Sequence, residues 1–217
     1  MSILNLASYI DHTLLRPDAT SKEIEILCSE AIEHRFACVC VNGCHVQLAN
    51  GILREYEIPV GSVVGFPLGA SVSTTKVFEM ATAIDDGASE IDVVMNLGWF
   101  KNKDYRKVAS ELRIMRAVAG SNVLKIIIET CYLDRREKLD ACKLCRDAGA
   151  DFVKTSTGFG PGGASVEDVG LLKEAAGSAI KIKAAGGIKT REFAEALISA
   201  GADRLGTSSS IAILRGV

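Results

Sequence analysis

The chain has 217 residues, of which 48% are hydrophobic and 24% are charged, and its 25 basic and 27 acidic residues give a formal net charge of −2. A chain of this length can bury a large core, and this composition is typical of a globular protein. Because the basic residues are mixed with acidic ones and form no block, we expect no nucleic-acid partner.

The N-terminal segment has no positively charged stretch, and it reaches Asp11 and His12 too early for a secretory signal. No apolar run approaches the roughly 18 residues that a membrane helix needs. We therefore expect a cytoplasmic protein with no membrane partner.

The seven cysteines are expected to be reduced thiols that pack mainly as small apolar residues. Two groups could suggest a redox or zinc site. Cys142 and Cys145 fall on one face of a predicted helix with no second pair nearby, which favours burial. The other group consists of Cys38, Cys40, Cys44 and His45. Cys38 and Cys40 share one strand face, whereas paired zinc ligands are usually separated by two to four residues. Core packing is the favoured interpretation of both, and no metal is expected.

Taken in chain order, eight short apolar runs alternate with amphipathic stretches. The runs are rich in Val and Ile, as expected for parallel strands that are covered on both faces. The predicted strands are residues 10–14, 37–41, 61–66, 90–95, 124–129, 152–156, 180–184 and 204–207.

The stretches between these strands have a helical period. The first opens with a capping-box pattern at Thr20 and Glu23. Most of the others end at a glycine, which suits the left-handed cap that turns a helix into the next strand. The predicted helices include residues 73–86, 105–119, 133–148, 165–176 and 190–200, and a short last helix begins near Ile211.

Similar joints between helix and strand recur at residues 86–92, 147–153 and 199–205, where a Gly-Ala pair comes one or two positions before an acidic residue. This recurrence favours a repeated βα unit. Eight units in this length predict one (β/α)8 TIM barrel domain over residues 1–217, with a short N-terminal helical segment. The alternative, a doubly wound open sheet, usually has a glycine-rich turn after its first strand, and residues 16–18 read Arg-Pro-Asp instead.

Three ionisable residues lie inside otherwise apolar strands: Asp92, Lys154 and Lys183. Lys154 and Lys183 come from consecutive strands, and two ammonium groups close together in low dielectric disfavour the charged form, so at least one pKa should fall. A neutral lysine amine is what a Schiff-base nucleophile requires. The alternative is that both lysines pair with carboxylates such as Asp92, Asp11 or Glu129 and only stabilise the barrel.

The turns after the last strands carry a second signal. Gly186 and Gly187 follow the seventh strand, and Ser208 and Ser209 follow the eighth, where barrel enzymes often hold a phosphate group. Small residues there let backbone N–H groups approach an anion, and Gly158 can contribute from the sixth strand. Ordinary tight turns are the alternative.

Seven segments, in order, carry a resemblance to a known family: residues 10–15, 39–42, 64–69, 90–96, 152–159, 183–187 and 204–209. Together they resemble the deoxyribose-phosphate aldolases, class I aldolases that split 2-deoxy-D-ribose 5-phosphate into glyceraldehyde 3-phosphate and acetaldehyde. The resemblance runs nearly end to end. It implies a metal-free and cofactor-free lyase that acts on a small phosphorylated sugar, and a homodimer or homotetramer.

The resemblance also implies roles for particular residues. Lys154 corresponds to the Schiff-base lysine, and Lys183 to a second lysine that lowers the pKa of Lys154 and assists proton transfer. Asp92 corresponds to the carboxylate that moves protons through a water. Asp11 and Thr13 match a segment near the substrate, and Cys40 matches a cysteine that lines the pocket. The sequence departs from the family at Gly43, where relatives often have proline.

Three other functions stay open. A different phosphate-binding barrel enzyme would use Asp92 as a base without covalent chemistry. A zinc-dependent aldolase would need convergent ligands, and of His12, His34 and His45 the second lies at the end of the first helix, away from the predicted site. A non-catalytic phosphate-binding scaffold would leave the two strand lysines unexplained.

Overall fold

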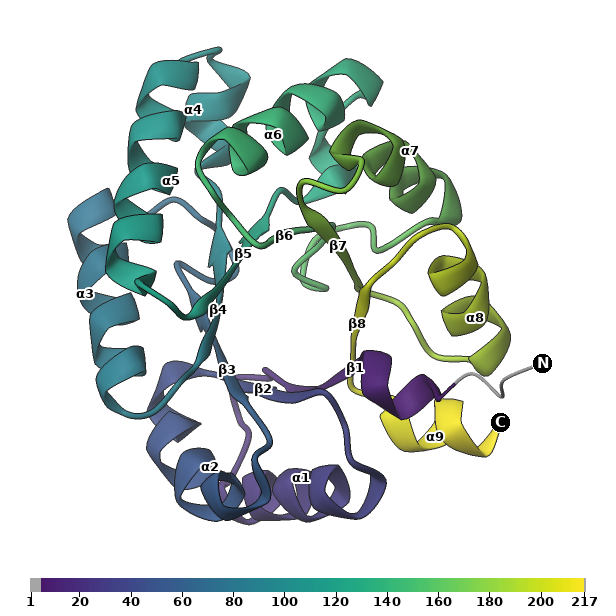
Figure 1. Cartoon of the computed structure of the whole chain (residues 1–217). Helices are drawn as coiled ribbons and strands as arrows, with labels where there is room; N and C mark the ends of the chain where they lie inside the picture. The colour runs from purple at the N-terminus through teal and green to yellow at the C-terminus, as the bar shows by residue number, and fades with distance from the viewer. Residues whose placement is uncertain (1–4, 217) are drawn as a thin grey trace.

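The computed structural model describes residues 5–216, and its centre is a closed barrel of eight parallel strands in chain order (Figure 1). The first and last strands pair and close the barrel, so the predicted (β/α)8 architecture is confirmed. The strands are β1 (Ile10–Leu14), β2 (Cys38–Val41), β3 (Val60–Val64), β4 (Glu90–Val94), β5 (Val123–Ile127), β6 (Phe152–Lys154), β7 (Lys181–Ala185) and β8 (Arg204–Thr207).

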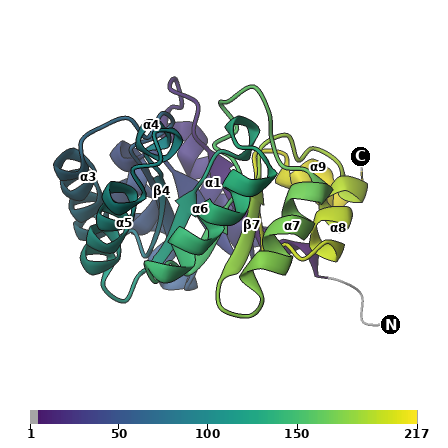
Figure 2. The same ribbon diagram turned by 90° about the horizontal axis from the view of Figure 1, so that it is seen from above.

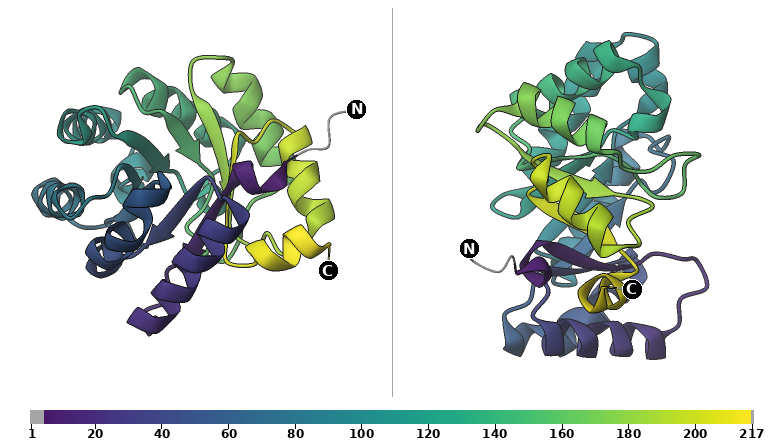
Figure 3. Two further views of the ribbon diagram at one scale, coloured as in Figure 1. Left: turned by 60° about the horizontal axis from the view of Figure 1, so that its bottom comes forward. Right: turned by 90° about the vertical axis from the view of Figure 1, so that its right-hand side faces the viewer.

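Helices form the outer layer around these strands (Figure 2). The α-helices are α1 (Ser21–His34), α2 (Val46–Leu53), α3 (Ser73–Asp85), α4 (Leu97–Lys101), α5 (Tyr105–Ala119), α6 (Arg135–Asp147), α7 (Val166–Ala176), α8 (Arg191–Ser199) and α9 (Ser210–Arg215). Four single turns of 3-10 helix are η1 (Leu6–Tyr9), η2 (Gly43–His45), η3 (Arg54–Tyr56) and η4 (Thr130–Tyr132). The last helix, α9, lies beside η1 and α8 (Figure 3). Within residues 5–216, no helix has both the length and the apolar character needed to cross a membrane.

Several predicted strands end earlier than the apolar pattern suggested. The third leaves the sheet after Val64 because Gly65 takes a positive φ of 62°. The fifth ends at Ile127, ahead of Glu129, which has a φ of 49°. The sixth ends at Lys154, because the hydroxyl of Thr155 accepts the Ala185 N–H in place of a backbone carbonyl. All three early ends lie at the carboxyl-terminal rim of the barrel, because the strands are parallel.

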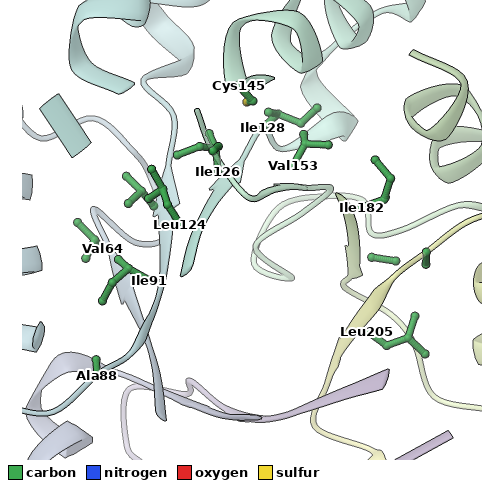
Figure 4. Close-up of a cluster of buried hydrophobic side chains, with 14 of the residues drawn as sticks. Val64, Ala88, Ile91, Leu124, Ile126, Ile128, Cys145, Val153, Ile182 and Leu205 are labelled. Carbon is green, nitrogen blue, oxygen red and sulfur yellow. The ribbon is translucent and has the colours of Figure 1, made fainter. Parts of the chain in front are cut away.

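Alternation along the strands separates two environments. Apolar side chains such as Ile91, Ile126 and Ile182 lie on the outer side of the strands, under the helices (Figure 4). The residues between them point inward, and many of these are charged, including Asp92 and Lys125. Barrel interiors are usually filled by branched apolar side chains. The interior of this barrel is instead an ion-pair network, which is described below.

A second buried ion pair lies outside the barrel and was not predicted. Lys76 of α3 and Glu111 of α5 are both buried, with 3.0 Å between Nζ and Oε2. The same ammonium donates to the Val94 carbonyl at 2.8 Å, and Ser73 donates to Glu111 at 3.0 Å. Burial lowers the pKa of Lys76 against the opposing pull of Glu111. The pair joins α3 and α5 to the end of β4.

Replacing Lys76 with methionine is expected to lower the free energy of unfolding by about 3–5 kcal/mol, because the buried Glu111 carboxylate loses its only cation among the described residues. Removing both charges, as in Lys76→Met with Glu111→Leu, should recover much of that loss. Urea unfolding of the three proteins measures both effects. A single variant as stable as the parent would contradict this assignment.

Candidate active site

A pocket of about 260 Å³ opens at the carboxyl ends of β1, β6, β7 and β8. This volume is slightly below the roughly 300–1,000 Å³ that is usual for small-molecule sites. It is the rim where barrel enzymes place their active sites. The structure brings seven of the predicted site residues together in its lining: Thr13, Lys154, Gly158, Gly186, Gly187, Ser208 and Ser209.

Lys154 lies at the inner end of this pocket and connects it to a buried acid. Its Nζ donates to Asp92 Oδ2 at 2.8 Å, and the side chain is 3% exposed. Lys183 Nζ donates to the same Asp92 oxygen at 2.7 Å and also to Asp11 Oδ2. Asp11, Asp92 and Lys183 are fully buried beneath the pocket. One carboxylate oxygen is therefore shared by both predicted lysines.

Three further charged residues complete the network, and the sequence analysis missed all of them. Lys125 donates to Asp92 Oδ1 at 2.8 Å and lies 2.6 Å from Glu90. Arg204 donates to Asp11 Oδ1 at 2.5 Å and lies 3.3 Å from Glu90. A signal for Lys125 was present in the sequence. Lys125 interrupts an apolar strand between Leu124 and Ile126, in the same way as Lys154 follows Val153.

The carboxylates and lysines of the network shift one another's pKa values. Burial alone would raise the pKa of Asp92, but Lys125, Lys154 and Lys183 hold it well below its usual range. Burial would lower the pKa of Lys183, yet Asp11 and Asp92 outweigh it and raise that pKa above its ordinary value. The expected fall in a lysine pKa considered only the two ammonium groups, whereas the alternative, in which both lysines pair with carboxylates, describes the observed contacts with Asp92 and Asp11. Asp92 accepts from both lysines, so Lys183 keeps its proton.

Asp11 makes the fold sensitive to acid. Burial opposes its charge, but Lys183, Lys125 and Arg204 lower its pKa from 3.8 to about 2. The ionised carboxylate therefore stabilises the folded state at neutral pH, by about 2 kcal/mol, and this contribution is lost as the pH falls from about 4 through about 2. Urea unfolding should show the parent more stable than Asp11→Asn at pH 7 and a smaller gap at pH 3. An equal gap at both pH values would contradict this.

The other side of the pocket is built from glycine-rich turns. Gly186 has a φ of 90°, and a Cβ there would meet the Gly163 Cα at 3.0 Å, so this contact requires glycine. Gly187 has a φ of 76°, with open space where a Cβ would point. The N–H groups of Gly186 and Gly187 donate to no acceptor among residues 5–216. Free N–H groups beside the hydroxyls of Ser208 and Ser209 suit an anionic oxygen.

Two residues do not have the positions considered from the sequence: Cys40 as a pocket-lining residue and Glu129 as a partner of the lysines. Cys40 is buried beneath the pocket with Leu15 and Val63, and it is not among the lining residues. Glu129 pairs with neither strand lysine in the described structure. Its carboxylate instead accepts from the Thr157 N–H at 3.1 Å and from the hydroxyl of Thr157. It therefore fixes the turn that leads to Gly158.

One group could in principle bind a cation. Asp11, Cys38 and Glu90 place ligand atoms within 4.8 Å of one another. Both carboxylates are already paired with Lys125 or Arg204, and burial raises the pKa of the Cys38 thiol well above its usual value. A metal ion prefers a thiolate and unpaired carboxylates. The donor chemistry therefore favours the ion-pair network over a metal at this position.

Comparison with known proteins agrees with this geometry. Residues 5–216 match the family described as DeoC/LacD family aldolase. A deoxyribose-phosphate aldolase from Thermoanaerobacter sp. (strain X514) is 51% identical over 214 residues, covering 97% of this chain and 96% of that protein. Another, from Thermococcus kodakarensis, is 52% identical over 221 residues, covering 100% and 98%.

Two solved structures are similarly close. One, described as "QR15, an Aldolase", has a TM-score of 0.95 at 44% identity and covers 98% of this chain and 96% of its own. A second, described as the unique tetrameric structure of deoxyribose phosphate aldolase from Aeropyrum pernix, has a TM-score of 0.92 at 34% identity, with coverage of 97% and 89%.

Proposed function

The chain belongs to the DeoC/LacD family of aldolases, and from this we propose that it is a deoxyribose-phosphate aldolase. In this reaction 2-deoxy-D-ribose 5-phosphate is cleaved reversibly to D-glyceraldehyde 3-phosphate and acetaldehyde through a Schiff base on Lys154. The observation that carries the proposal is the position of Lys154, which is the one lysine of the buried network that also lines the pocket.

The charge of the network supports Lys154 as the amine that reacts. Three carboxylates face four cationic groups when all are ionised: Asp11, Glu90 and Asp92 against Lys125, Lys154, Lys183 and Arg204. Loss of one proton leaves the network electrically neutral. Lys154 can release that proton toward the pocket, whereas Lys183 and Lys125 are enclosed by carboxylates. A neutral amine is the form that attacks a carbonyl.

The proposed steps follow from this arrangement. The Lys154 amine adds to the aldehyde carbon of the open-chain sugar, and loss of water gives a protonated imine. The C3 hydroxyl gives up its proton, the C2–C3 bond breaks, and its electron pair enters the imine to form an enamine. Glyceraldehyde 3-phosphate leaves. Protonation of the enamine carbon and addition of water release acetaldehyde and restore Lys154.

Asp92 and Lys183 are proposed to carry protons in these steps. Asp92 Oδ2 is within hydrogen-bond distance of both lysine nitrogens, so a proton can pass between them without rearrangement of the network. Asp11 holds Lys183 from the other side, and Thr13 lines the pocket above it. We assign Asp11 and Thr13 supporting roles, and we assign Cys40 only a packing role.

The phosphate is proposed to bind at the opposite side of the pocket, where Gly158, Gly186, Gly187, Ser208 and Ser209 meet. The enzyme should therefore cleave 2-deoxyribose 5-phosphate with a much lower KM than 2-deoxyribose. Its kcat should be unchanged by a metal chelator, because no step above uses a metal or cofactor. A coupled assay of glyceraldehyde 3-phosphate release tests both statements. Loss of activity with the chelator, or no cleavage of the phosphorylated sugar, would refute the proposal.

We also propose that residues 1–217 act as one catalytic domain in the cytoplasm, assembled as a homodimer or homotetramer. The seven cysteines are free thiols, as a reducing compartment requires. Leu68, Val72 and Phe78 are each at least 60% exposed, and such large apolar side chains are common at contacts between copies. Light scattering after size-exclusion chromatography measures the assembly, and a monomer at micromolar concentration would refute it.

A further inference from the structure

A chain of three polar side chains lies outside the barrel and takes no part in the mechanism above. His12 of β1 has one ring nitrogen, Nδ1, 2.7 Å from Ser210 Oγ of α9. Its other nitrogen, Nε2, is 2.8 Å from Glu30 Oε2 of α1. The ring of Phe36 packs against the imidazole with 4.8 Å between centroids. The chain thus joins β1 and the neighbouring α1 to α9 at the other end of the sequence.

The direction of the hydrogen bonds follows from the chemistry of the groups. An ionised carboxylate can only accept, so Nε2 carries the proton that is donated to Glu30. Burial lowers the pKa of His12 against the opposing pull of Glu30, which favours a neutral ring at pH 7. Nδ1 then accepts from the hydroxyl of Ser210. His12 and Ser210 are buried, so this serine cannot meet a substrate as a hydrolase nucleophile would.

Ser210 connects this chain to the proposed phosphate site through the backbone, because it directly follows Ser209. Its single hydroxyl proton is donated to His12, so it cannot also be donated to the Thr207 carbonyl oxygen 3.3 Å away. The Thr207 hydroxyl donates to the Ile188 carbonyl at 2.6 Å and accepts from the Ser209 N–H at 2.9 Å. Ile188 directly follows Gly187. Thr207 therefore connects the two turns that carry the phosphate-binding residues. The hydrogen bond between Ser210 and His12 holds one of these turns from outside the barrel.

We propose that His12 is a positioning residue for phosphate recognition, through the chain Glu30–His12–Ser210. In this role it holds the turn between β8 and α9 at the separation from Gly187 that a phosphate group requires. Ser208 and Ser209 are then already positioned before the phosphate binds, so binding requires little ordering of this turn. This inference rests on the proposed function. It concerns binding of the phosphate and leaves the lysine chemistry unaffected.

The direct test is Ser210→Ala, which removes one buried hydroxyl and adds no bulk. We expect KM for 2-deoxyribose 5-phosphate and the inhibition constant of inorganic phosphate to rise by about 3- to 10-fold, the size of one lost hydrogen bond. We expect kcat to stay within about twofold, and kcat/KM for unphosphorylated 2-deoxyribose to stay unchanged.

The matched control is Ser62→Ala. Ser62 is equally buried, but it lies on β3 and its hydroxyl donates only to the neighbouring Val63 carbonyl at 3.4 Å. It should leave both constants at parent values. Thermal unfolding of both variants shows whether the folds are equally stable.

Three further variants test the role of His12 without depending on the folding of Ser210→Ala: Glu30→Gln, His12→Asn and His12→Leu. Glu30 is half-buried at the surface, so Glu30→Gln should fold, and it should raise both constants in the same direction by a smaller factor. In His12→Asn the side-chain oxygen can replace Nδ1 as acceptor for Ser210. The His12→Asn variant should therefore bind phosphate more tightly than His12→Leu, because leucine cannot accept the Ser210 hydrogen bond.

Three results would overturn the inference. They are unchanged phosphate inhibition in Ser210→Ala, an equal loss of kcat/KM for the sugar with and without phosphate, or His12→Asn no better than His12→Leu. Failure of the proposed function is a different result, because the parent enzyme would then not cleave 2-deoxyribose 5-phosphate at all.

Discussion

Replacing Lys154 with methionine is expected to lower kcat for cleavage of 2-deoxyribose 5-phosphate by roughly 10⁴-fold or more, as loss of a covalent nucleophile usually does. Methionine has nearly the same length, and it removes one cation from a network that has four cations and three carboxylates. The buried charges of the variant therefore balance, and we expect it to fold with a stability close to that of the parent.

Lys154→Arg is the matched control for charge. It keeps a cation beside Asp92, but a guanidinium stays protonated in proteins and cannot act as the nucleophile. Both variants should therefore be inactive while only the arginine variant keeps the charge. Steady-state kinetics with thermal unfolding separates loss of chemistry from loss of fold. A folded methionine variant with more than about a hundredth of the parent kcat would contradict the role of Lys154.

Replacing Lys183 with methionine is expected to lower kcat by about 10²- to 10⁴-fold, the usual contribution of a positioned proton carrier. Lys183 shares Asp92 Oδ2 with Lys154, so its loss interrupts the path by which a proton reaches the reacting amine. The variant should also lose stability, because Lys183 bonds both Asp11 and Asp92 in the barrel interior, whereas Lys154 bonds Asp92 alone at the pocket.

Lys125→Met provides the matched comparison. Lys125 is as fully buried as Lys183 and also bonds Asp92, but through Oδ1, the oxygen that does not contact Lys154. Both variants remove the same charge from the same carboxylate. The loss of kcat should be at least about tenfold smaller in Lys125→Met, while the loss of stability, measured by urea unfolding, should be similar. Equal losses of kcat would show that Lys183 acts only through the stability of the network.

Much of the fold could be predicted from the sequence because its signals are local. Apolar runs and glycine caps marked all eight strands, and β1 and β8 have the predicted bounds. Strand ends were less predictable, since they depend on contacts between neighbours. Thr155 stops β6 by accepting the Ala185 N–H, and no property of residues 152–156 alone indicates this.

The site was predictable where a polar residue interrupts an apolar strand near the rim, as Lys154 and Asp92 do. Of the carboxylates considered as partners of the two lysines, Asp92 and Asp11 are the observed ones, and Glu129 is not. Lys183 was expected to act on Lys154 directly, but both lysines bond Asp92 Oδ2, and Asp11 together with Asp92 raises the pKa of Lys183. Lys125 was missed although it interrupts an apolar strand as Lys154 does. Arg204 was missed because its role appears only when the barrel closes and brings β8 toward Asp11 and Glu90. The contact of His12 with Ser210 could not be predicted either, because it depends on where α9 packs.

The central claim is that Lys154 forms a covalent imine, and trapping with borohydride tests it most directly. The enzyme is incubated with acetaldehyde and sodium borohydride, digested, and analysed by mass spectrometry, with a parallel sample that lacks acetaldehyde. We predict one dominant two-carbon reduced adduct, on the peptide that contains Lys154, and its absence from Lys154→Met. An adduct confined to other lysines, or none in an enzyme that still cleaves its substrate, would contradict the account.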